Sequence, residues 1–202
     1  MNAITPPNRG DLARPELGPL LSVLFLMIDE VRSVVLHVTS ARHGEGTTTI
    51  ARDLATAAAA ADWCKVALLD AHREPSGRAG LIEFVERGEQ PVLLGSGRIA
   101  AGRLSGSPQP ISRVDSVRAL YSTLRKSYAL IVVDCPPVLA DPQTLVMAPA
   151  ATETLLVIEA ERTPAADVMR ARAALEERGA SLMGVVLNKS RARVPKVLAR
   201  VL

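Results

Sequence analysis

Five short runs of Val, Leu, Ile and Ala constrain the fold of this 202-residue chain more than any other feature. They lack a regular alternation of apolar and polar residues, which is typical of strands buried on both faces of a parallel sheet. The runs lie at residues 34–39, 65–70, 129–134, 154–160 and 182–188. Helical patterns lie before and between them at 20–31, 47–62, 116–127 and 164–178. Strands that alternate with helices predict an open, mostly parallel α/β sheet with helices on both faces.

The predicted elements make up one domain with two terminal extensions. A chain of this length suits a single domain with a full core, and with aromatic residues at only 2%, that core must consist of Val, Leu, Ile and Ala. We expect residues 19–191 to form the domain, 1–18 a flexible lead-in containing Pro and Gly, and 192–202 a basic tail. Residues 75–110, which are rich in Gly, Pro, Ser and Arg, are expected to form surface connections with one helix at 81–87.

The net charge of +3 comes from arginines that are scattered among acidic residues. This distribution predicts no nucleic-acid partner. The basic tail is either a solvated segment or one that meets an acidic partner or an anionic membrane surface. The longest apolar stretch, 17–28, is too short to span a bilayer and lacks the pattern of a signal peptide. Cys64 and Cys135 lack metal-ligand spacing and are expected to be packing thiols in a reducing cytoplasm.

A glycine-containing loop joins the first predicted strand to the helix that follows it. Its sequence is SARHGEGTTT at residues 40–49. The backbone N–H groups of such a loop and of the first helical turn make a site for a phosphate group. The residues expected to bind a nucleotide there are Gly44, Glu45, Gly46, Thr47, Thr48 and Thr49, with the Thr48 hydroxyl placed to reach a magnesium ion. The alternative is a strand-to-helix turn that binds nothing.

One residue of this loop departs from a working phosphate clamp. A lysine is expected directly after Gly46, and Thr47 occupies that place. A lysine ammonium about 4 Å from a phosphate charge contributes roughly 4 kcal/mol at an effective dielectric of about 20, before its desolvation is counted. We therefore expect nucleotide affinity to be weaker by about one to three powers of ten. Arg42, His43 and Lys65 are the cations considered as partial substitutes.

Two aspartates end predicted strands. Asp70 and Asp134 both lie at carboxyl ends of parallel strands, where the metal of a nucleotide needs oxygen ligands. We assign them as catalytic residues and, together with Thr48, as metal ligands. His72 has no partner histidine or cysteine at ligand spacing, so a loop role is expected for it rather than a metal role. Asn188, which ends the last strand, either contacts an adenine edge as a nucleotide-binding residue or caps a turn.

Four segments, spread over residues 32–191, follow the order of motifs in a known family. The first two are VTSARHGEGTTTIARDLATAAA and VALLDAHREP, and the others are YALIVVDCPPVLADPQTLVMAPAATETLLVIEAERT and GVVLNK. In this order they resemble the Walker A, Walker A′ and Walker B segments and the last core strand of the bacterial tyrosine kinases and related proteins of capsule and exopolysaccharide synthesis. The resemblance implies an α/β P-loop NTPase-like fold of the MinD/ParA class.

The resemblance also implies an activity, from which this chain departs at three places. Proteins of the family bind ATP and magnesium, act with a membrane-embedded chain-length regulator of polysaccharide export, and phosphorylate tyrosines in their own C-terminal tail. Here Thr47 replaces the Walker A lysine, His72 replaces the second Walker A′ aspartate, and no tyrosine follows Leu187. The only tyrosines, Tyr121 and Tyr128, precede the Walker B strand. The resemblance therefore implies ancestry and pathway more securely than catalysis, and leaves open whether the chain is an enzyme.

The leading hypothesis is a degenerate, kinase-like protein of bacterial exopolysaccharide or capsule synthesis. It regulates a membrane chain-length determinant with weak or no phosphoryl transfer, and binds ATP or ADP with Mg²⁺ weakly or not at all. Its expected partners are that determinant and a second copy of the chain, and its expected place is the cytoplasm or, through the partner, the inner face of the plasma membrane. One alternative is an active tyrosine kinase or ATPase in which Arg42 or a neighbouring subunit supplies the missing cation. The other is a MinD/ParA-type positioning ATPase that binds membrane or DNA.

Overall fold

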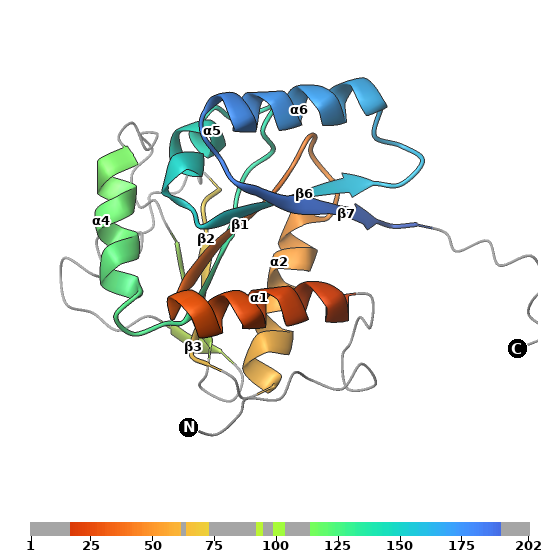
Figure 1. Cartoon of the computed structure of the whole chain (residues 1–202). Helices are drawn as coiled ribbons and strands as arrows, with labels where there is room; N and C mark the ends of the chain where they lie inside the picture. Colours follow the sequence, from red (N-terminus) through yellow and green to blue (C-terminus); the bar gives the residue numbers. More distant parts are fainter. Residues whose placement is uncertain (1–16, 62–63, 73–91, 95–98, 104–113, 191–202) are drawn as a thin grey trace, which may run out of the picture.

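A seven-stranded sheet forms the centre of the computed structural model, which describes residues 17–61, 64–72, 92–94, 99–103 and 114–190 (Figure 1). The strands stand in the order β3-β4-β2-β5-β1-β6-β7. β3 runs antiparallel to β4, and the other neighbouring pairs are parallel. Their bounds are β1 Val34–Ser40, β2 Val66–Asp70, β3 Val92–Leu94, β4 Ile99–Arg103, β5 Leu130–Asp134, β6 Glu153–Glu159 and β7 Leu182–Asn188. The predicted α/β fold with a mostly parallel sheet is confirmed.

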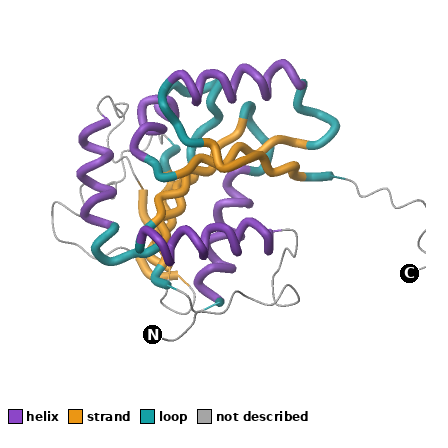
Figure 2. Tube along the Cα trace, in the orientation of Figure 1, coloured by secondary structure: helices purple, strands orange, loops and turns teal. Residues whose placement is uncertain are grey.

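Helices cover both faces of this sheet (Figures 1 and 2). They are α1 Gly18–Val31, α2 Thr47–Ala60, α4 Val114–Leu124, α5 Gln143–Met147 and α6 Ala165–Glu177, with a 3-10 turn at Ala148–Ala150. α1 and α2 pack on one face, against strand residues that include Val34 and Leu36. α4 packs on the other face against Val35 and Ile131, and α6 packs there against Leu156. Consecutive strand residues point to opposite faces, so the apolar runs are buried on both sides.

The five predicted strands and the four predicted main helices are all present, with ends shifted by a few residues. The helix predicted at 20–31 begins earlier, at Gly18, because Pro19 lies in its first turn, where a missing N–H breaks no hydrogen bond. The helix predicted at 47–62 ends at Ala60. Of the predicted lead-in, residues 1–16 lie outside the described part of the chain, and so do the predicted tail at 192–202 and the predicted helix at 81–87.

The prediction that residues 75–110 form surface connections is wrong for two segments, because β3 and β4 belong to the sheet. β4 pairs in parallel with β2, and Ile99 and Ala100 are buried. Both strands are short, and β4 ends in Gly102 and Arg103, so neither forms an apolar run that stands out in the sequence. Their pairing with a neighbouring strand, which is a tertiary contact, makes them strands. The sequence also does not predict helix α5, whose five residues are too few to give a helical pattern.

The first helix has apolar residues on both its buried and its exposed side. Leu21 and Leu24 are fully buried in the core that α1 shares with β1 and α2, whereas Leu26 is 62% exposed. Within the described part of the chain, no helix is long and apolar enough to cross a membrane.

Both cysteines are free, and both pack against the core. Burial raises the pKa of the Cys64 thiol from 9.0 to about 11 and that of the Cys135 thiol well above its usual range. A thiol with so high a pKa stays protonated and is a poor nucleophile. The two residues are therefore packing thiols, as the sequence predicts.

A polar pair is buried in the core beside α4. His37 of β1 is completely buried, and its Nε2 lies 2.7 Å from the hydroxyl oxygen of Tyr121 on α4. Its Nδ1 is buried without a hydrogen-bond partner among the described residues. Burial lowers the pKa of His37 from 6.5 to about 3. The imidazole is therefore neutral in the folded protein at any pH well above 3.

We predict that His37 makes folding stability fall as the pH drops from 6.5 toward 3. The pKa is lowered in the folded state, so below pH 6.5 the unfolded chain takes up a proton that the folded chain does not. At a pH of about 5 this difference favours unfolding by roughly 2 kcal/mol, and above 6.5 it vanishes. Urea denaturation at a pH of about 5 and again at about 7 gives the free energy of unfolding at each. The drop in this free energy from the higher to the lower pH should be smaller for His37→Leu than for the wild type. The exposed His43, changed to Gln, serves as the control; an unaltered pH dependence in His37→Leu would contradict the prediction.

Candidate functional site

The loop between β1 and α2 has the backbone of a phosphate-binding turn. Gly44 and Gly46 have φ angles of 82° and 95°, in the left-handed region that glycine adopts without strain. Gly46 is the N-cap residue of α2, and no side chain caps that helix end by a hydrogen bond. The first-turn N–H groups, together with the positive end of the helix dipole, are therefore arranged so that they can bind an anion. Thr47 is nearly buried in this first turn, and Thr49 is exposed.

The side chain of Glu45 is turned into the protein instead of toward a phosphate site. The residue is 3% exposed, and its Oε2 accepts a hydrogen bond from the Arg42 N–H at 2.8 Å. Its Oε1 accepts another from the hydroxyl of Thr163, in the connection between β6 and α6. The carboxylate therefore shapes the loop and ties it to the neighbouring strand. Of the residues assigned to nucleotide binding, Glu45 can offer only its backbone.

Asn188, at the end of β7, holds the loop from another side. Its Nδ2 donates a hydrogen bond to the carbonyl oxygen of Glu45 at 2.8 Å, and the residue is 7% exposed. A Cβ added to Gly46 would lie only 2.1 Å from this Nδ2. Neither role considered from the sequence, an adenine contact or a turn cap, includes this contact. The structure places Asn188 as a support of the loop, through a pairing between residues 143 positions apart.

The cations around the loop are paired with acidic side chains. Arg42 forms an ion pair with the buried Asp167 of α6. The Lys189 Nζ donates to the Gly44 carbonyl oxygen at 2.7 Å and lies 3.0 Å from Oε2 of Glu159. Arg162 pairs with the same Glu159 at 3.2 Å. The hydrogen bond from Lys189 is the main reason that the pKa of Glu159 is lowered.

Of the cations considered as substitutes for the missing lysine, Lys65 lies at the wrong edge of the sheet. It precedes β2, and its carbonyl accepts a hydrogen bond from the Ala129 N–H just before β5, whereas the loop follows the carboxyl end of β1. His43 is exposed on the loop itself. The structure adds a cation that the sequence did not suggest: burial raises the pKa of Asp134, and the charge of Arg52, in the second turn of α2, partly opposes that rise.

Asp70 and Asp134 lie side by side because β2 and β5 pair in parallel with these two residues in register. Asp134 is 5% exposed, whereas the side chain of Asp70 is 37% exposed. Burial raises the pKa of Asp134, and the negative charge of Asp70 raises it further. The nearby hydroxyl of Thr48 and the charge of His72 oppose this rise. The three residues assigned as metal ligands, Thr48, Asp70 and Asp134, are thus brought together at one edge of the sheet.

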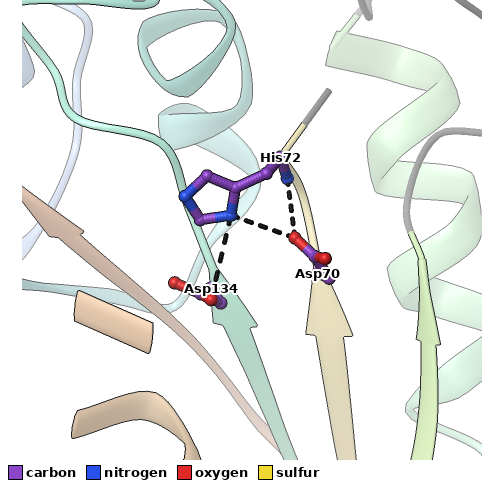
Figure 3. A group of neighbouring side chains, drawn as sticks. All are labelled: Asp70, His72 and Asp134. Atoms are coloured by element: carbon purple, nitrogen blue, oxygen red, sulfur yellow. Dashed lines mark hydrogen bonds and ion pairs between the residues drawn. The ribbon is translucent and has the colours of Figure 1, made fainter. Parts of the chain in front are cut away.

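His72 joins these two aspartates, although the sequence suggested only a loop role for it (Figure 3). Its Nδ1 lies 3.0 Å from Oδ1 of Asp70 and 3.8 Å from Oδ2 of Asp134. Its backbone N–H also donates to Oδ1 of Asp70 at 2.9 Å. The hydrogen bond to Asp70 is the main cause that raises the pKa of His72, and the charges of Asp134 and Asp141 add to it, while burial opposes it. In the sequence, the spacing Asp-x-His at the end of a strand is the signal that points to this contact, although His72 has no histidine or cysteine partner at ligand spacing.

We predict that Gly46→Ala destabilises the protein more than Gly44→Ala. Both changes force a non-glycine residue into the left-handed region, which costs about 1 to 2 kcal/mol. Only the Gly46 change also drives a methyl group into Asn188, since nothing lies within 4 Å of a Cβ added to Gly44. Urea denaturation of both variants measures the difference. Measured against Asn188→Ala alone, Gly46→Ala should cost less than it does in the wild type, because the clash is gone, and equal losses in the two glycine variants would contradict the prediction.

Comparison with known proteins finds relatives of this chain by sequence. No protein-family profile matches the chain. It is 26% identical over 172 residues to tyrosine-protein kinase CpsD of Streptococcus pneumoniae serotype 4, which covers 77% of this chain and 75% of the relative. It is also 26% identical over 197 residues to tyrosine-protein kinase Etk of Escherichia coli K12, a match that covers 90% of this chain. The chain spans only 27% of the length of Etk.

Solved structures share the fold. The kinase domain of Escherichia coli Etk superposes with a TM-score of 0.67 at 24% identity, over 85% of this chain and 72% of that domain. The MinD cell division protein of Aquifex aeolicus superposes with a TM-score of 0.59 at 20% identity, over 83% of this chain and 73% of MinD. The chain is therefore similar in sequence to bacterial tyrosine kinases, and it shares the α/β P-loop NTPase-like fold of the Etk kinase domain and of MinD.

Proposed function

We propose that this chain is a degenerate, kinase-like P-loop protein of bacterial exopolysaccharide or capsule synthesis. In this proposal it regulates a membrane chain-length determinant by binding, with weak or no phosphoryl transfer. It works in the cytoplasm or, held by that partner, at the inner face of the plasma membrane. The motif resemblance supports the pathway and the partner, the tyrosine-kinase relatives support the kinase-like ancestry, and Thr47 supports weak or absent phosphoryl transfer.

The observation that carries the proposal is Thr47 at the first position of α2, directly after the loop. A lysine there would bring an ammonium group to the phosphates, and a threonine hydroxyl brings no charge. Two cations at the loop do not compensate freely, since Arg42 pairs with Asp167 and Lys189 with Glu159. Drawing either one to a phosphate breaks an existing ion pair.

The residues that remain still fit a magnesium nucleotide in part. The glycine backbone and the first turn of α2 suit a phosphate, and Thr48, Asp70 and Asp134 offer oxygen atoms to a metal. Oδ1 of Asp134 is buried without a hydrogen-bond partner among the described residues, which suits a metal ligand. A bound magnesium nucleotide would supply the phosphoryl group for transfer. The chain's own part would be to position it, and the charge needed to stabilise the transfer is reduced.

The two tyrosines of the chain are poorly placed for self-phosphorylation. Tyr121 is 2% exposed, and its hydroxyl is hydrogen-bonded to His37 in the core. Tyr128 lies beyond α4 at the amino end of β5, the edge of the sheet opposite the loop. Phosphorylation of this chain on its own tyrosines is therefore not part of the proposed function.

Restoring the lysine should restore nucleotide binding. We predict that Thr47→Lys binds ATP with Mg²⁺ about 10- to 1000-fold more tightly than the wild type, since the new ammonium group faces the phosphates. Isothermal titration calorimetry on the full chain measures both affinities. The matched control is Thr56→Lys, which adds the same charge at an exposed position farther along the same helix, outside the assigned site, and should leave the affinity close to that of the wild type.

Micromolar binding of ATP by the wild type, not improved in Thr47→Lys, would overturn the proposal. The chain would then be a working nucleotide-dependent enzyme in which another cation replaces the lysine. Arg52 and Lys189 are the first candidates. The charge of Arg52 influences the pKa of Asp134, and Lys189 donates a hydrogen bond to the loop. Loss of binding in Arg52→Ala or Lys189→Ala would identify which one acts.

A further inference from the structure

We infer that Asp70, His72 and Asp134 form a binding site for a divalent transition metal ion, with Zn²⁺ and Co²⁺ preferred over Mg²⁺, that fills without any nucleotide. This inference goes beyond the proposed function: it shares Asp70 and Asp134 with the magnesium ligands named there, but it needs no nucleotide and adds His72. It rests on the imidazole that joins two carboxylates at the ends of β2 and β5 (Figure 3).

The distances between the three side chains suit a shared metal ion. One ligand atom from each residue lies within 4.8 Å of the others, and Nδ1 of His72 lies 3.0 Å and 3.8 Å from its two carboxylate neighbours. A metal ion bound at about 2.1 Å holds neighbouring ligand atoms roughly 3.0 to 3.4 Å apart. The 3.0 Å separation already matches that spacing, and the side chains of Asp70 and His72 are each 37% exposed rather than locked in the core.

The buried carboxylate points to a ligand independently of these distances. Asp134 is 5% exposed, and its Oδ1 has no hydrogen-bond partner among the described residues. A buried carboxylate oxygen that lacks a partner costs free energy, and a metal ion bound by both oxygens of Asp134 would supply that partner. A divalent ion also offsets the repulsion between two carboxylates held in register on neighbouring strands.

The backbone around the site is fixed before any ion arrives. The Ala71 N–H donates to the Asp134 carbonyl oxygen at 2.9 Å, which locks the chain between Asp70 and His72 against β5. The Gln143 side chain of α5 donates to the Ala71 carbonyl oxygen at 2.7 Å and is almost completely buried. Ligands carried on such a rigid edge lose little conformational freedom when they bind an ion.

The type of ligand decides which ion is preferred. Mg²⁺ takes oxygen ligands and keeps several waters, whereas an imidazole nitrogen suits Zn²⁺, Co²⁺ and related ions. An aspartate at position 72 would make the set all-oxygen, so His72 is the residue that sets the preference. His72→Asp is therefore the variant that should reverse it.

The test uses the full chain stripped of metal with a chelator, without nucleotide and in excess Mg²⁺. Zn²⁺ titration by calorimetry should give one site, and Co²⁺ should give the visible absorption of nitrogen and oxygen ligation. We expect His72→Ala and His72→Asp each to weaken Zn²⁺ binding by about 10-fold or more, because one imidazole ligand is lost. His43→Gln, which changes an exposed histidine outside the site, should bind Zn²⁺ like the wild type.

Three results would overturn the inference: equal Zn²⁺ affinity in His72→Ala and the wild type, displacement of Zn²⁺ by Mg²⁺ at similar concentrations, or a thiolate charge-transfer band with Co²⁺. The last would assign the ion to a cysteine. His72 is half-exposed, so its substitution should leave the fold intact, and circular dichroism checks this. Failure of Thr47→Lys to bind ATP would count against the proposed function alone and leave the metal site standing.

Discussion

The parallel pairing of β5 with both β2 and β1 is the constraint on which the site depends. In this register Asp134 stands opposite Asp70 on one side and Val38 on the other, so the strand ends and the loop after β1 meet at one edge. Strands of different register would place the two carboxylates at different heights, and neither would face the first turn of α2. The apolar residues of the same strands hold this register, because a slip by one residue would turn buried side chains toward the wrong face.

A second group of interactions preserves the shape of the loop. Glu45 and Asn188 bind the loop from within the protein, and Arg42 ties it to α6. These contacts need no phosphate, so the loop can keep its conformation with Thr47 in place of a lysine. These contacts explain how a chain can keep the fold that it shares with the Etk kinase domain without a lysine after Gly46.

The carboxyl edge of the sheet thus combines two features with different consequences. On the helix side, Thr47 brings no positive charge, so we expect a lower affinity for nucleotides than a lysine at this position would give. On the strand side, His72 adds a nitrogen ligand to two carboxylates and favours a different class of metal ion. Both are single-residue departures on a retained scaffold, so each can be reversed by one substitution without rebuilding the fold.

The sequence by itself determined the main strands, the loop and the shared edge of Asp70 and Asp134, because long apolar runs and strand-to-helix alternation are local patterns. It also determined that Thr47 stands where a lysine is expected. The short strands β3 and β4 and the partners of Glu45, Asn188, Arg42 and His72 were decided only by the tertiary structure. These features depend on which distant segments become neighbours, as in the contact of Asn188 with a carbonyl 143 positions away, and no local pattern in the chain records that choice.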